Sequence, residues 1–525
     1  MTNGAAPTPR VPGRRRLRAA AAATALAMAA VPAAARPATA ASCEGPFRYA
    51  HSSNTLYVTG ASVTLSDVVA LCPGAPVRLV DRASGTWQLD ADLQLHEGAG
   101  LTLRSRARGG DVDVLRLLSG PGGTRDDVVS ITAYPGTIVL DGVTVTSWDP
   151  ATAGPDTDHA VPSGGTRGRA FIRALSVLVD GVPRESRMDI VDSDVGYLGY
   201  YGAEAYGVAY KARGCGLSPE AQEVCDVLDV HGRQLRSRFH HNFMGTYTWG
   251  ALGMEFRDNE YDHNVSYGLD PHDDSDHLVV TGNSFHDNGN HGFICSQRCD
   301  HLTVTDNVSY DNGHVPWVGP GDDDPSDNQV HGIMLHRGVT DTVVARNRVW
   351  GHSTGAGIAV FDSHDDAVVD NEVWDNKYGL RFSVGARDLD VRGNVVRSSG
   401  AYAVFTYRGS DDPVYTGTSG RPSDIRFADN VFSGSGKELM KLKEADRLTF
   451  TGGSIAGPAS SGPRVDQGTG HVWGASVSRP SPELRFVLRG ADGAPTSVHF
   501  AGIPRGEVPV SVDTWSTATW GGTPQ

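Results

Sequence analysis

The chain has 525 residues, of which 39% are hydrophobic and 20% are charged, a content that can bury a large core. After the first 40 residues, no apolar run approaches the length of a membrane-spanning helix, so a polytopic membrane protein is excluded. The formal net charge of −15 disfavours nucleic acid and anionic membrane surfaces as partners.

Residues 1–40 have the pattern of an export signal. A basic block precedes an Ala-rich run over 19–30, and Ala38-Thr39-Ala40 offers a small-x-small cleavage site. We therefore expect an exported protein, periplasmic or extracellular, that is cleaved near Ala40. The segment carries six Arg and no Asp or Glu, so its removal takes the formal charge from −15 to −21. Cys43 lies three residues past the cleavage site, and a lipidated N-terminus is the alternative.

The six cysteines suit an oxidising compartment. They fall into sequence-adjacent pairs, and bonding within each pair is the simplest of the possible connectivities: Cys43 with Cys72, Cys215 with Cys225, and Cys295 with Cys299. The sequence has no CxxC pair, so a thiolate zinc cluster is not expected, and we predict neither a metal nor a cofactor.

The mature chain divides into three predicted regions. Residues 41–85 are expected to cap the N-terminal end of the fold, with a short helix over 64–73. Residues 86–455 consist of short β-branched runs such as HLVVTG and DTVVAR, which Asn, Asp and Gly separate into strands and turns without helical periodicity. Residues 456–525 are expected to form a less regular β tail.

An asparagine-headed phrase recurs through the middle of the chain. Its members begin at Asn259, Asn283, Asn307, Asn347, Asn371, Asn394 and Asn430. The steps between them are 24, 24, 40, 24, 23 and 36 residues, so each long step is one coil plus an insertion. This repeat predicts an all-β fold, a right-handed single-stranded parallel β-helix with coils of about 24 residues. A propeller or leucine-rich array is the weaker alternative, because the WD and LxxLxL signatures are missing.

Alignment of the coils on a recurring glycine sorts one strand of each coil into two faces. The inward positions are apolar: Leu269, Phe293, Ile333, Ile358 and Leu380. The outward positions form two columns that predict the floor of a groove. One column holds Tyr247, Asp270, Ile294, Met334, Ala359 and Arg381, and the other holds Trp249, His272, Ser296, His336, Phe361 and Ser383.

One of these strands departs from the repeat and reads YGLDPHDD over 267–274. Pro271 removes a backbone donor from a strand in the middle of a sheet, a fault typical of functional sites. Asp270 and His272 share the outward face, and a His beside a carboxylate is a candidate for proton transfer near neutral pH. A solvated turn is the alternative for such a tripeptide, but its predicted place in a groove favours a site.

The YGLDPHD segment, followed by NSFHDNGNHGF and by a strand with Ser296 and Arg298, resembles the mannuronan C5-epimerases of alginate biosynthesis, whose hallmark is a YG-x-DPHD rung on a right-handed β-helix. A weaker likeness extends over about residues 86–455. The resemblance implies an enzyme, a mannuronan 5-epimerase, that converts β-D-mannuronate to α-L-guluronate within the polymer without chain cleavage.

The reaction removes a proton alpha to a carboxylate and returns one from the opposite face, and a cation must stabilise the enolate-like dianion between these steps. The resemblance implies His272 as the base, with Asp270 orienting it, and Tyr267 or a water as the acid. Strand parity alone points Tyr267 inward, so its role depends on a strand that starts after Gly268. Arg298 is the expected cation, although it stands one residue later than the family spacing.

Further groove residues are candidates for binding the substrate, which we expect to be an anionic polysaccharide. Arg381, and with less support Arg337, Lys377 and Arg387, are placed to bind uronate carboxylates, with ordinary surface charge as the alternative. Tyr247 and Trp249 are candidates for stacking on sugar rings, with an aromatic ladder as the alternative. Ser296 and His336 lie in the same outward column. We expect a monomer that binds no nucleic acid and spans no membrane.

The insertion over 313–330 is placed to fold over the groove as a lid, and its acidic run is either a cation-binding segment or, as we favour, a solvated tip. Calcium-binding nonapeptide repeats are missing from the sequence, so calcium dependence is not implied. Two other functions remain open. A polysaccharide lyase abstracts the same proton but eliminates the glycosidic bond, and a non-catalytic carbohydrate-binding protein uses the same scaffold.

Overall fold

The computed structural model describes residues 43–120, 123–124, 127–159, 167–314, 329–477 and 484–522. The predicted export signal at 1–40 and nearly all of the 313–330 insertion lie outside the described residues. No helix within the described ranges is long and apolar enough to cross a membrane. The residues from 41 onward form one compact unit.

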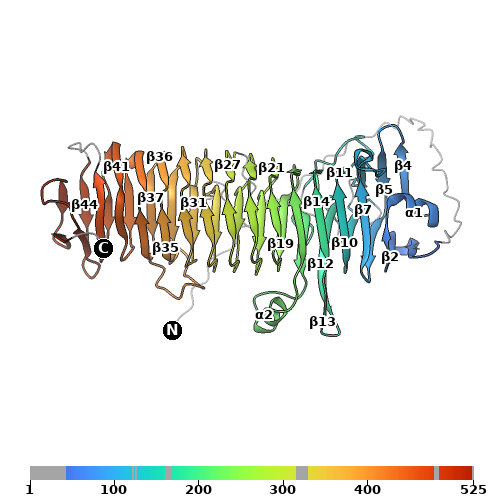
Figure 1. The fold of residues 1–525 in the computed structure, drawn as a ribbon, viewed down its shortest axis with the longest axis horizontal. Coiled ribbons are helices and arrows are strands. Elements are labelled where there is room, and N and C mark those ends of the chain that lie inside the picture. Colours follow the sequence, from blue (N-terminus) through green and yellow to red (C-terminus); the bar gives the residue numbers. More distant parts are fainter. Residues whose placement is uncertain are drawn as a thin grey trace, which may run out of the picture. The chain divides into compact units, whose positions relative to one another are not determined.

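The chain from Thr55 to Trp520 winds into stacked coils whose strands lie side by side with their counterparts in the next coil (Figure 1). Each complete coil in the middle of the fold places one strand in a first sheet, called sheet 1, and two consecutive strands in a second sheet, called sheet 2. Strands of neighbouring coils pair in parallel, as β22 does with β19 and β25. The structure is therefore a parallel β-helix, as predicted.

Sheet 1 contains one strand from each coil: β2 (Thr55–Thr59), β6 (Asp92–His96), β9 (Ser130–Ala133), β12 (Phe171–Val179), β16 (Gly207–Ala212), β19 (Met244–Trp249), β22 (Leu269–His272), β25 (Phe293–Cys295), β28 (Ile333–His336), β31 (Ala356–Phe361), β34 (Tyr378–Ser383), β37 (Tyr402–Tyr407), β40 (Met440–Lys443), β42 (Arg464–Asp466), β44 (Phe486–Arg489) and β46 (Val510–Val512).

Sheet 2 is made of two columns. The first column contains β3 (Ser62–Val63), β7 (Ala99–Arg104), β10 (Gly136–Asp141), β14 (Arg187–Val191), β17 (His231–Leu235), β20 (Glu255–Arg257), β23 (Val279–Thr281), β26 (Thr303–Thr305), β29 (Val343–Ala345), β32 (Ala367–Val369), β35 (Arg387–Arg392), β38 (Ser423–Ala428), β41 (Thr449–Ser461), β43 (His471–Val477), β45 (Thr496–Phe500) and β47 (Ser516–Trp520). The second contains β5 (Thr86–Leu89), β8 (Val114–Leu118), β11 (Thr144–Trp148), β15 (Asp194–Gly196), β18 (Arg238–His240), β21 (Glu260–Asp262), β24 (Ser284–His286), β27 (Val308–Tyr310), β30 (Arg348–Trp350), β33 (Glu372–Trp374), β36 (Val395–Ser399) and β39 (Val431–Glu438).

The repeating asparagines occupy the corner between the two columns of sheet 2, where a buried ladder of amides runs from coil to coil. The Asn307 Oδ1 accepts from the backbone N–H of Asn283 at 2.9 Å and from its Nδ2 at 3.0 Å. The Nδ2 of Asn307 donates to the Val280 carbonyl at 2.9 Å and to the Asn347 Oδ1 at 3.0 Å. The sequence repeat thus exists because each amide closes the turn of its neighbour.

The inward column of sheet 1 forms the apolar core, as predicted. Its members are at most 1% exposed: Leu269, Phe293, Ile333, Ile358 and Leu380. Both outward columns also keep the predicted register, because Asp270 pairs with Tyr247, His272 with Trp249, and Ala359 with Arg381.

Both ends of the helix differ in detail from the predicted regions. The cap holds α1 (Leu65–Leu71), which starts at a Thr64–Asp67 capping box, and two antiparallel hairpins in which β1 (Phe47–Ala50) pairs with β2 and β4 (Val77–Asp81) pairs with β5. However, β2 and β3 already pair in parallel with β6 and β7, so the first coil begins before residue 86. At the other end, β41 crosses the predicted boundary at 455, and the later strands continue both sheets.

Three segments project from the same side of the coils in Figure 1: the β12–β13 hairpin, with β13 (Val182–Arg184), the segment that carries α2 (Pro219–Cys225), and the segment between β37 and β38. The α2 helix was not predicted, although Ser218 caps its N-terminus and Pro219 takes its first position, a pattern that signals a helix start. All three predicted disulfides form, and Cys215–Cys225 closes the α2 segment.

Candidate active site

The strand that carries the DPHD sequence, β22, lies where the ladder of sheet 1 loosens. It pairs with β19 at four positions, from Leu269 to His272. With β25 on the other side it pairs only at Leu269 and Phe293. Pro271 has no backbone N–H to give to the neighbouring strand, which explains the early end of this pairing. The predicted fault in the sheet is therefore present at the predicted site.

Asp270 is a buried carboxylic acid on the groove face of β22. Its side chain is 2% exposed, and its Oδ1 accepts a hydrogen bond from Ser296 Oγ at 2.6 Å. Burial raises the pKa of Asp270 to about 6, although His272 and the Ser296 hydrogen bond act in the opposite direction. Ser296 therefore lies in the site as expected, and it holds Asp270 from the next coil.

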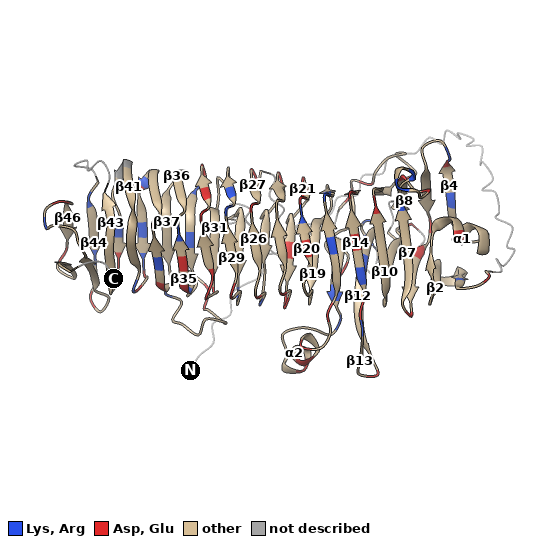
Figure 2. Ribbon diagram, in the orientation of Figure 1, with Lys and Arg blue, Asp and Glu red and all other residues tan. Residues whose placement is uncertain are grey.

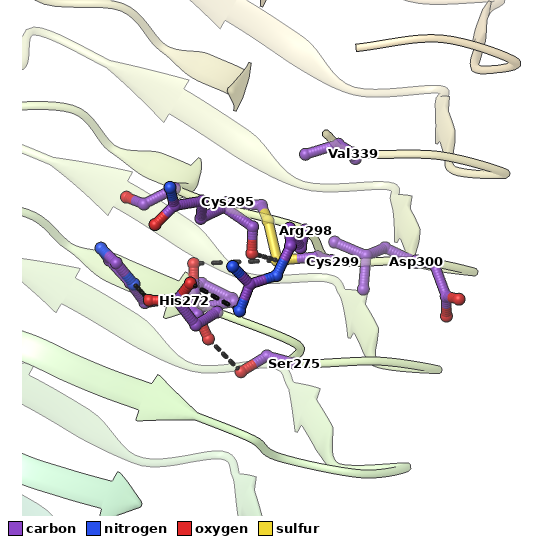
Figure 3. Close-up of a disulfide and its surroundings, with 12 residues drawn as sticks. His272, Ser275, Cys295, Arg298, Cys299, Asp300 and Val339 are labelled. Carbon is purple, nitrogen blue, oxygen red and sulfur yellow. Dashed lines mark hydrogen bonds and ion pairs between the residues drawn. A yellow bond between two sulfur atoms is a disulfide. The ribbon is translucent and has the colours of Figure 1, made fainter. Parts of the chain in front are cut away.

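His272 is oriented by Asp273 rather than by Asp270, the residue predicted for that task. The His272 Nδ1 lies 2.6 Å from Asp273 Oδ2 (Figure 3). Asp273 and Asp274 both have positive φ, 23° and 52°, so the chain turns directly after the strand and Asp273 reaches back to the ring. Burial lowers the pKa of His272, but the Asp273 hydrogen bond and the charges of Asp270 and Asp273 outweigh it and raise the pKa above its ordinary value.

Trp249 packs between His272 and a lysine that the sequence did not identify, Lys211. The Trp249 and His272 rings stack at 5.1 Å with an interplanar angle of 18°, and the Lys211 Nζ lies 4.1 Å from the Trp249 ring centroid. Lys211 and His272 come from the coils on either side of Trp249, so both faces of the indole are covered. Trp249 thus supports the site by packing between these two groups. Tyr247 is 5% exposed and packs 5.7 Å from His272.

Lys211 belongs to a cationic group on the N-terminal side of His272. Glu204 pairs with Arg213 at 2.6 Å, with Arg173 at 3.2 Å and with Lys211 Nζ at 3.9 Å, so three cations share one carboxylate. Figure 2 shows Lys and Arg in blue and Asp and Glu in red along the coils. The early coils have irregular spacing, and only the strand register brings Lys211 beside Trp249. Sequence spacing alone gave no signal for it.

Arg298 is committed to carboxylates of the protein itself. Arg298 lies within the short loop that the predicted Cys295–Cys299 disulfide closes. Its Nη2 lies 3.0 Å from Asp273 Oδ1, and its Nε donates to Asp274 Oδ1 at 3.2 Å (Figure 3). The predicted role as the cation for a substrate carboxylate does not fit this arrangement. Instead, Arg298 fixes Asp273, which in turn holds His272.

Two projecting segments reach the Arg298 cluster from distant parts of the chain. From the α2 segment, the Gly216 carbonyl accepts from Arg298 Nη2 at 3.4 Å, and Gln222 Nε2 donates to Asp274 Oδ1 at 3.2 Å. From the segment after β37, Tyr415 Oη accepts from Gln297 Nε2 at 2.8 Å and contacts Arg298. The cluster behind His272 is thus enclosed from two sides.

Tyr267 lies on the groove side, because β22 begins only at Leu269 and strand parity does not extend to it. Its partly buried ring packs against two apolar clusters outside the main core, one with Tyr247 and one with Ile294. It stacks at 5.4 Å on His291, whose Nδ1 accepts the His331 backbone N–H. The condition that the sequence set for its role as the acid is therefore met.

In the three coils that follow β22, the outward column that contains Asp270 is apolar. Ile294, Met334 and Ala359 are at most 5% exposed and form the floor. Burial, followed by the charges of Arg337 and His272, lowers the pKa of His336 to about 3, so this imidazole is neutral. Arg381 follows in the same column as Ala359, donates to Tyr407 Oη and Gln329, and is 4% exposed.

Two of the other predicted carboxylate binders serve the segment between β37 and β38. Arg337 follows β28 with a φ of 62° and lies 3.9 Å from Asp411. Arg387 donates to the Thr416 carbonyl at 3.1 Å. Lys377 lies 5.4 Å from the Tyr378 ring centroid. The structure therefore brings Arg381 into the groove column but turns Arg337 and Arg387 toward a neighbouring segment.

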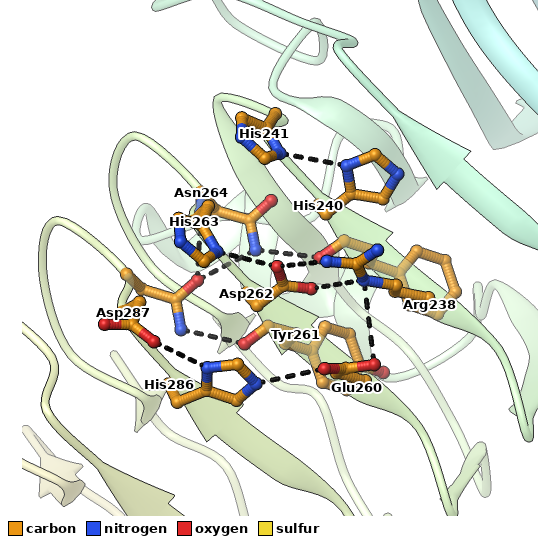
Figure 4. A network of polar contacts seen from close by, with 12 residues as sticks. Arg238, His240, His241, Glu260, Tyr261, Asp262, His263, Asn264, His286 and Asp287 are labelled. Carbon is orange, nitrogen blue, oxygen red and sulfur yellow. Dashed lines mark hydrogen bonds and ion pairs between the residues drawn. The ribbon is translucent and has the colours of Figure 1, made fainter.

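A second dense group of histidines and acids lies at the corner that leads from sheet 2 into sheet 1 (Figure 4). Asp262 accepts from Arg238 Nη2 and from His263 Nδ1, both at 2.7 Å. His286 pairs with Asp287 at 2.8 Å and with Glu260 at 3.1 Å. These groups pair mainly with one another across coils, so this network stabilises the stack, in contrast to the partly open imidazole of His272.

Comparisons with known proteins support both fold and resemblance. A family model described as "Right handed beta helix region" matches residues 227–323. The mannuronan C5-epimerase of Pseudomonas putida is 24% identical over 220 residues, 41% of this chain and 38% of that protein. The mannuronan C5-epimerase of Pseudomonas syringae pv. tomato is 24% identical over 185 residues, 35% of this chain and 31% of that protein. The chain thus matches about a third of the length of these relatives.

A crystal structure of the periplasmic alginate epimerase AlgG superposes with a TM-score of 0.59 at 18% identity, covering 74% of this chain and 81% of that one. A mutant of the same protein gives a TM-score of 0.60 over 81% and 85%. These comparisons confirm the predicted right-handed β-helix and the predicted resemblance to mannuronan C5-epimerases.

Proposed function

We propose that this protein is a mannuronan C5-epimerase that acts on alginate or a related polyuronate at the polymer level. The observation that carries the proposal is the His272–Asp273 pair beside buried Asp270, on the outward face of the strand that bears the epimerase motif. The similarity to named mannuronan C5-epimerases supports the same reaction, although the match covers only 38% of the P. putida protein.

In the proposed reaction, the Nε2 of His272 accepts the C5 proton of a mannuronate residue. The electron pair left on C5 delocalises into the adjacent carboxylate, which becomes an enediolate. Asp273 keeps the ring proton on Nδ1 and stabilises the imidazolium that forms, because its carboxylate lies 2.6 Å away. Tyr267, or a water beside it, then donates a proton to the opposite face of C5, and no glycosidic bond breaks.

The growing negative charge needs a cation that the protein has not already neutralised. Arg298 is occupied by Asp273 and Asp274, whereas Lys211 shares a single carboxylate with two arginines. Lys211 also lies on the face of Trp249 opposite His272. We therefore assign the stabilisation of the uronate carboxylate to Lys211. Arg381 binds a uronate residue farther along the substrate polymer.

Export fits this proposal, since the three disulfides suit an oxidising compartment. His272 is partly exposed on the outward side of sheet 1, where a long anionic chain can reach it. A monomer is sufficient, because every proposed group comes from one chain.

The direct test is incubation of purified protein with polymannuronate. Proton NMR measures guluronate, and ultraviolet absorbance measures unsaturated uronate ends. Guluronate without new ends is the expected result. Unsaturated ends would make the protein a lyase that uses the same base, and absence of both products would exclude polymannuronate as the substrate. Lys211→Met serves as the matched variant, and we expect it to lower turnover without affecting the folding transition.

A further inference from the structure

Two histidines and an aspartate meet on the turn that follows the active-site strand and on the same turn of the next coil. His277 lies between β22 and β23, and Asp300 and His301 lie between β25 and β26. The backbone N–H of His277 donates to the Asp300 carbonyl at 3.0 Å, which fixes the two turns against each other. His277 and His301 are 24 residues apart, one coil, so only the fold makes them neighbours.

The side chains of this group converge. The two imidazole rings stack with centroids 4.7 Å apart, and one ligand atom from each of the three residues lies within 4.8 Å of the others. Asp300 Oδ1 is 3.2 Å from His301 Nδ1. The same oxygen is buried and makes no hydrogen bond within the described part of the chain. Figure 3 shows the Asp300 side chain directed away from the Arg298 cluster, so the active site does not use it.

The separations suit a small transition-metal ion. Zinc binds imidazole nitrogen and carboxylate oxygen at about 2.0–2.2 Å in tetrahedral geometry, which places neighbouring ligand atoms about 3.3 Å apart. The 3.2 Å between Asp300 and His301 matches one edge of that tetrahedron. Calcium and magnesium prefer oxygen ligands, so a set of two nitrogens and one oxygen does not favour them.

Backbone geometry does not by itself demand histidine at these positions. His277 and His301 have φ values of 55° and 52°, in the left-handed region. The equivalent positions of the next two coils have φ values of 51° and 59° and hold Asp341 and Asp365. The turn therefore accepts aspartate readily, and the two adjacent imidazoles call for a different explanation.

We propose that His277, Asp300 and His301 form a binding site for a divalent transition-metal ion of the zinc type, with water as the fourth ligand. The ion joins the turn after His272 to the turn after Arg298, and so it clamps the two coils that build the active site. This inference is independent of the proposed epimerase activity, because it rests on the turn geometry alone.

The test uses cobalt as a spectroscopic substitute for zinc, on the full-length protein after treatment with a chelator. We expect one equivalent of Co²⁺ to bind and to give the visible absorption of a tetrahedral N,O site, and Zn²⁺ to displace it. The double variant His277→Asn/His301→Asn keeps residues that tolerate a left-handed turn, and it is expected to weaken binding at least about tenfold. His364→Asn is the matched control, since His364 lies in the adjacent turn column and pairs with Asp365.

A second readout is the thermal midpoint, which bound metal raises in proportion to its preference for the native state. Added Zn²⁺ should raise the midpoint of the wild type and of His364→Asn, but not that of the double variant. Binding of equal affinity in the double variant, or the absence of stoichiometric binding to the wild type, would overturn the proposal. If the double variant does not fold, the single variant His301→Asn takes its place, with the same expected loss.

Discussion

The asparagine corner and the active-site coil follow the same 24-residue repeat, but they treat buried polar groups differently. At the corner, each asparagine gives and receives hydrogen bonds from neighbouring coils, and its amide carries no charge. On β22, an aspartate takes the outward position that hydrophobic residues hold in the next three coils, and burial raises its pKa to about 6.

The difference separates positions selected for stability from positions that serve chemistry. A neutral amide satisfies the buried turn without the cost of burying a charge, whereas Asp270 on β22 keeps that cost because proton transfer needs titratable groups. Substitution of a structural asparagine should therefore lower the stability of the protein. Substitution of an active-site aspartate should lower the activity of the protein and raise its stability.

The largest effect that we expect falls on catalysis. Asp273→Asn removes the carboxylate that holds His272 Nδ1 and lowers turnover about 10²-fold, less than removal of the base itself would. The same change lowers the pKa of His272, because the Asp273 hydrogen bond and charge raise it. Since the base acts when neutral, the rise of kcat/KM with pH should move to lower pH. A pH–rate profile checks this, and an unmoved profile would contradict the assignment.

Asn307→Ala tests the other region. It leaves the Asn283 amide donors without their acceptor in a buried corner, and we expect it to lower the free energy of unfolding by about 1–3 kcal/mol. Urea denaturation measures the change. The control is Arg346→Ala in the next coil, which removes only an exposed ion pair with Asp306 and should leave the midpoint unchanged. Equal midpoints for the two variants would show that the ladder is not a main source of stability.

Asp270→Asn should act in the opposite sense on stability. Because the folded pKa of Asp270 is about 6 and the ordinary pKa of an aspartate is 3.8, the native state holds a proton that the unfolded state releases, and stability falls as pH rises between these values. Asparagine removes this loss, so the variant should be more stable than the wild type by about 2–3 kcal/mol at pH 8 but not at pH 4. Denaturation at both pH values gives the answer, and a less stable variant at pH 8 would refute it.

The smallest effect concerns the segment that reaches back from β37. Tyr415→Phe removes the hydroxyl that contacts Gln297 and Arg298, and we expect turnover to fall only about two- to fivefold, because the Cys295–Cys299 bulge still holds Arg298. Val414→Ala is the control, since Val414 is 73% exposed in the same segment. The two variants should unfold at the same denaturant concentration, and a loss of turnover in both would point to the segment as a whole rather than to the hydroxyl.

Sequence reasoning was strongest where contacts recur at a fixed interval. The coil step predicted the inward column and the outward register from Tyr247 to Arg381, and the sequence adjacency of the cysteines predicted the three disulfides. It failed where contacts depend on irregular segments. Tyr415 reaches Gln297 across 118 residues, and no spacing predicts that contact.

The remaining errors at the site have local causes. The chain makes a left-handed turn directly after His272, and this turn brings Asp273, not Asp270, to the imidazole. The alternation of a strand does not reveal such a turn. Arg298 looked like a cation for the substrate because its ion pairs with Asp273 and Asp274 depend on the same turn. Lys211 was missed because its coil lies among irregularly spaced repeats.

The central claim, that His272 removes the C5 proton without chain cleavage, is tested most directly by solvent deuterium. Polymannuronate is incubated in deuterium oxide with the wild type and with His272→Gln, and proton NMR follows C5 of the product. We predict guluronate that carries deuterium at C5 for the wild type, at unchanged chain length, and a rate lower by about 10²–10⁴-fold for the variant. Guluronate formed by the variant at the wild-type rate, or product that retains its original C5 hydrogen, would contradict the account.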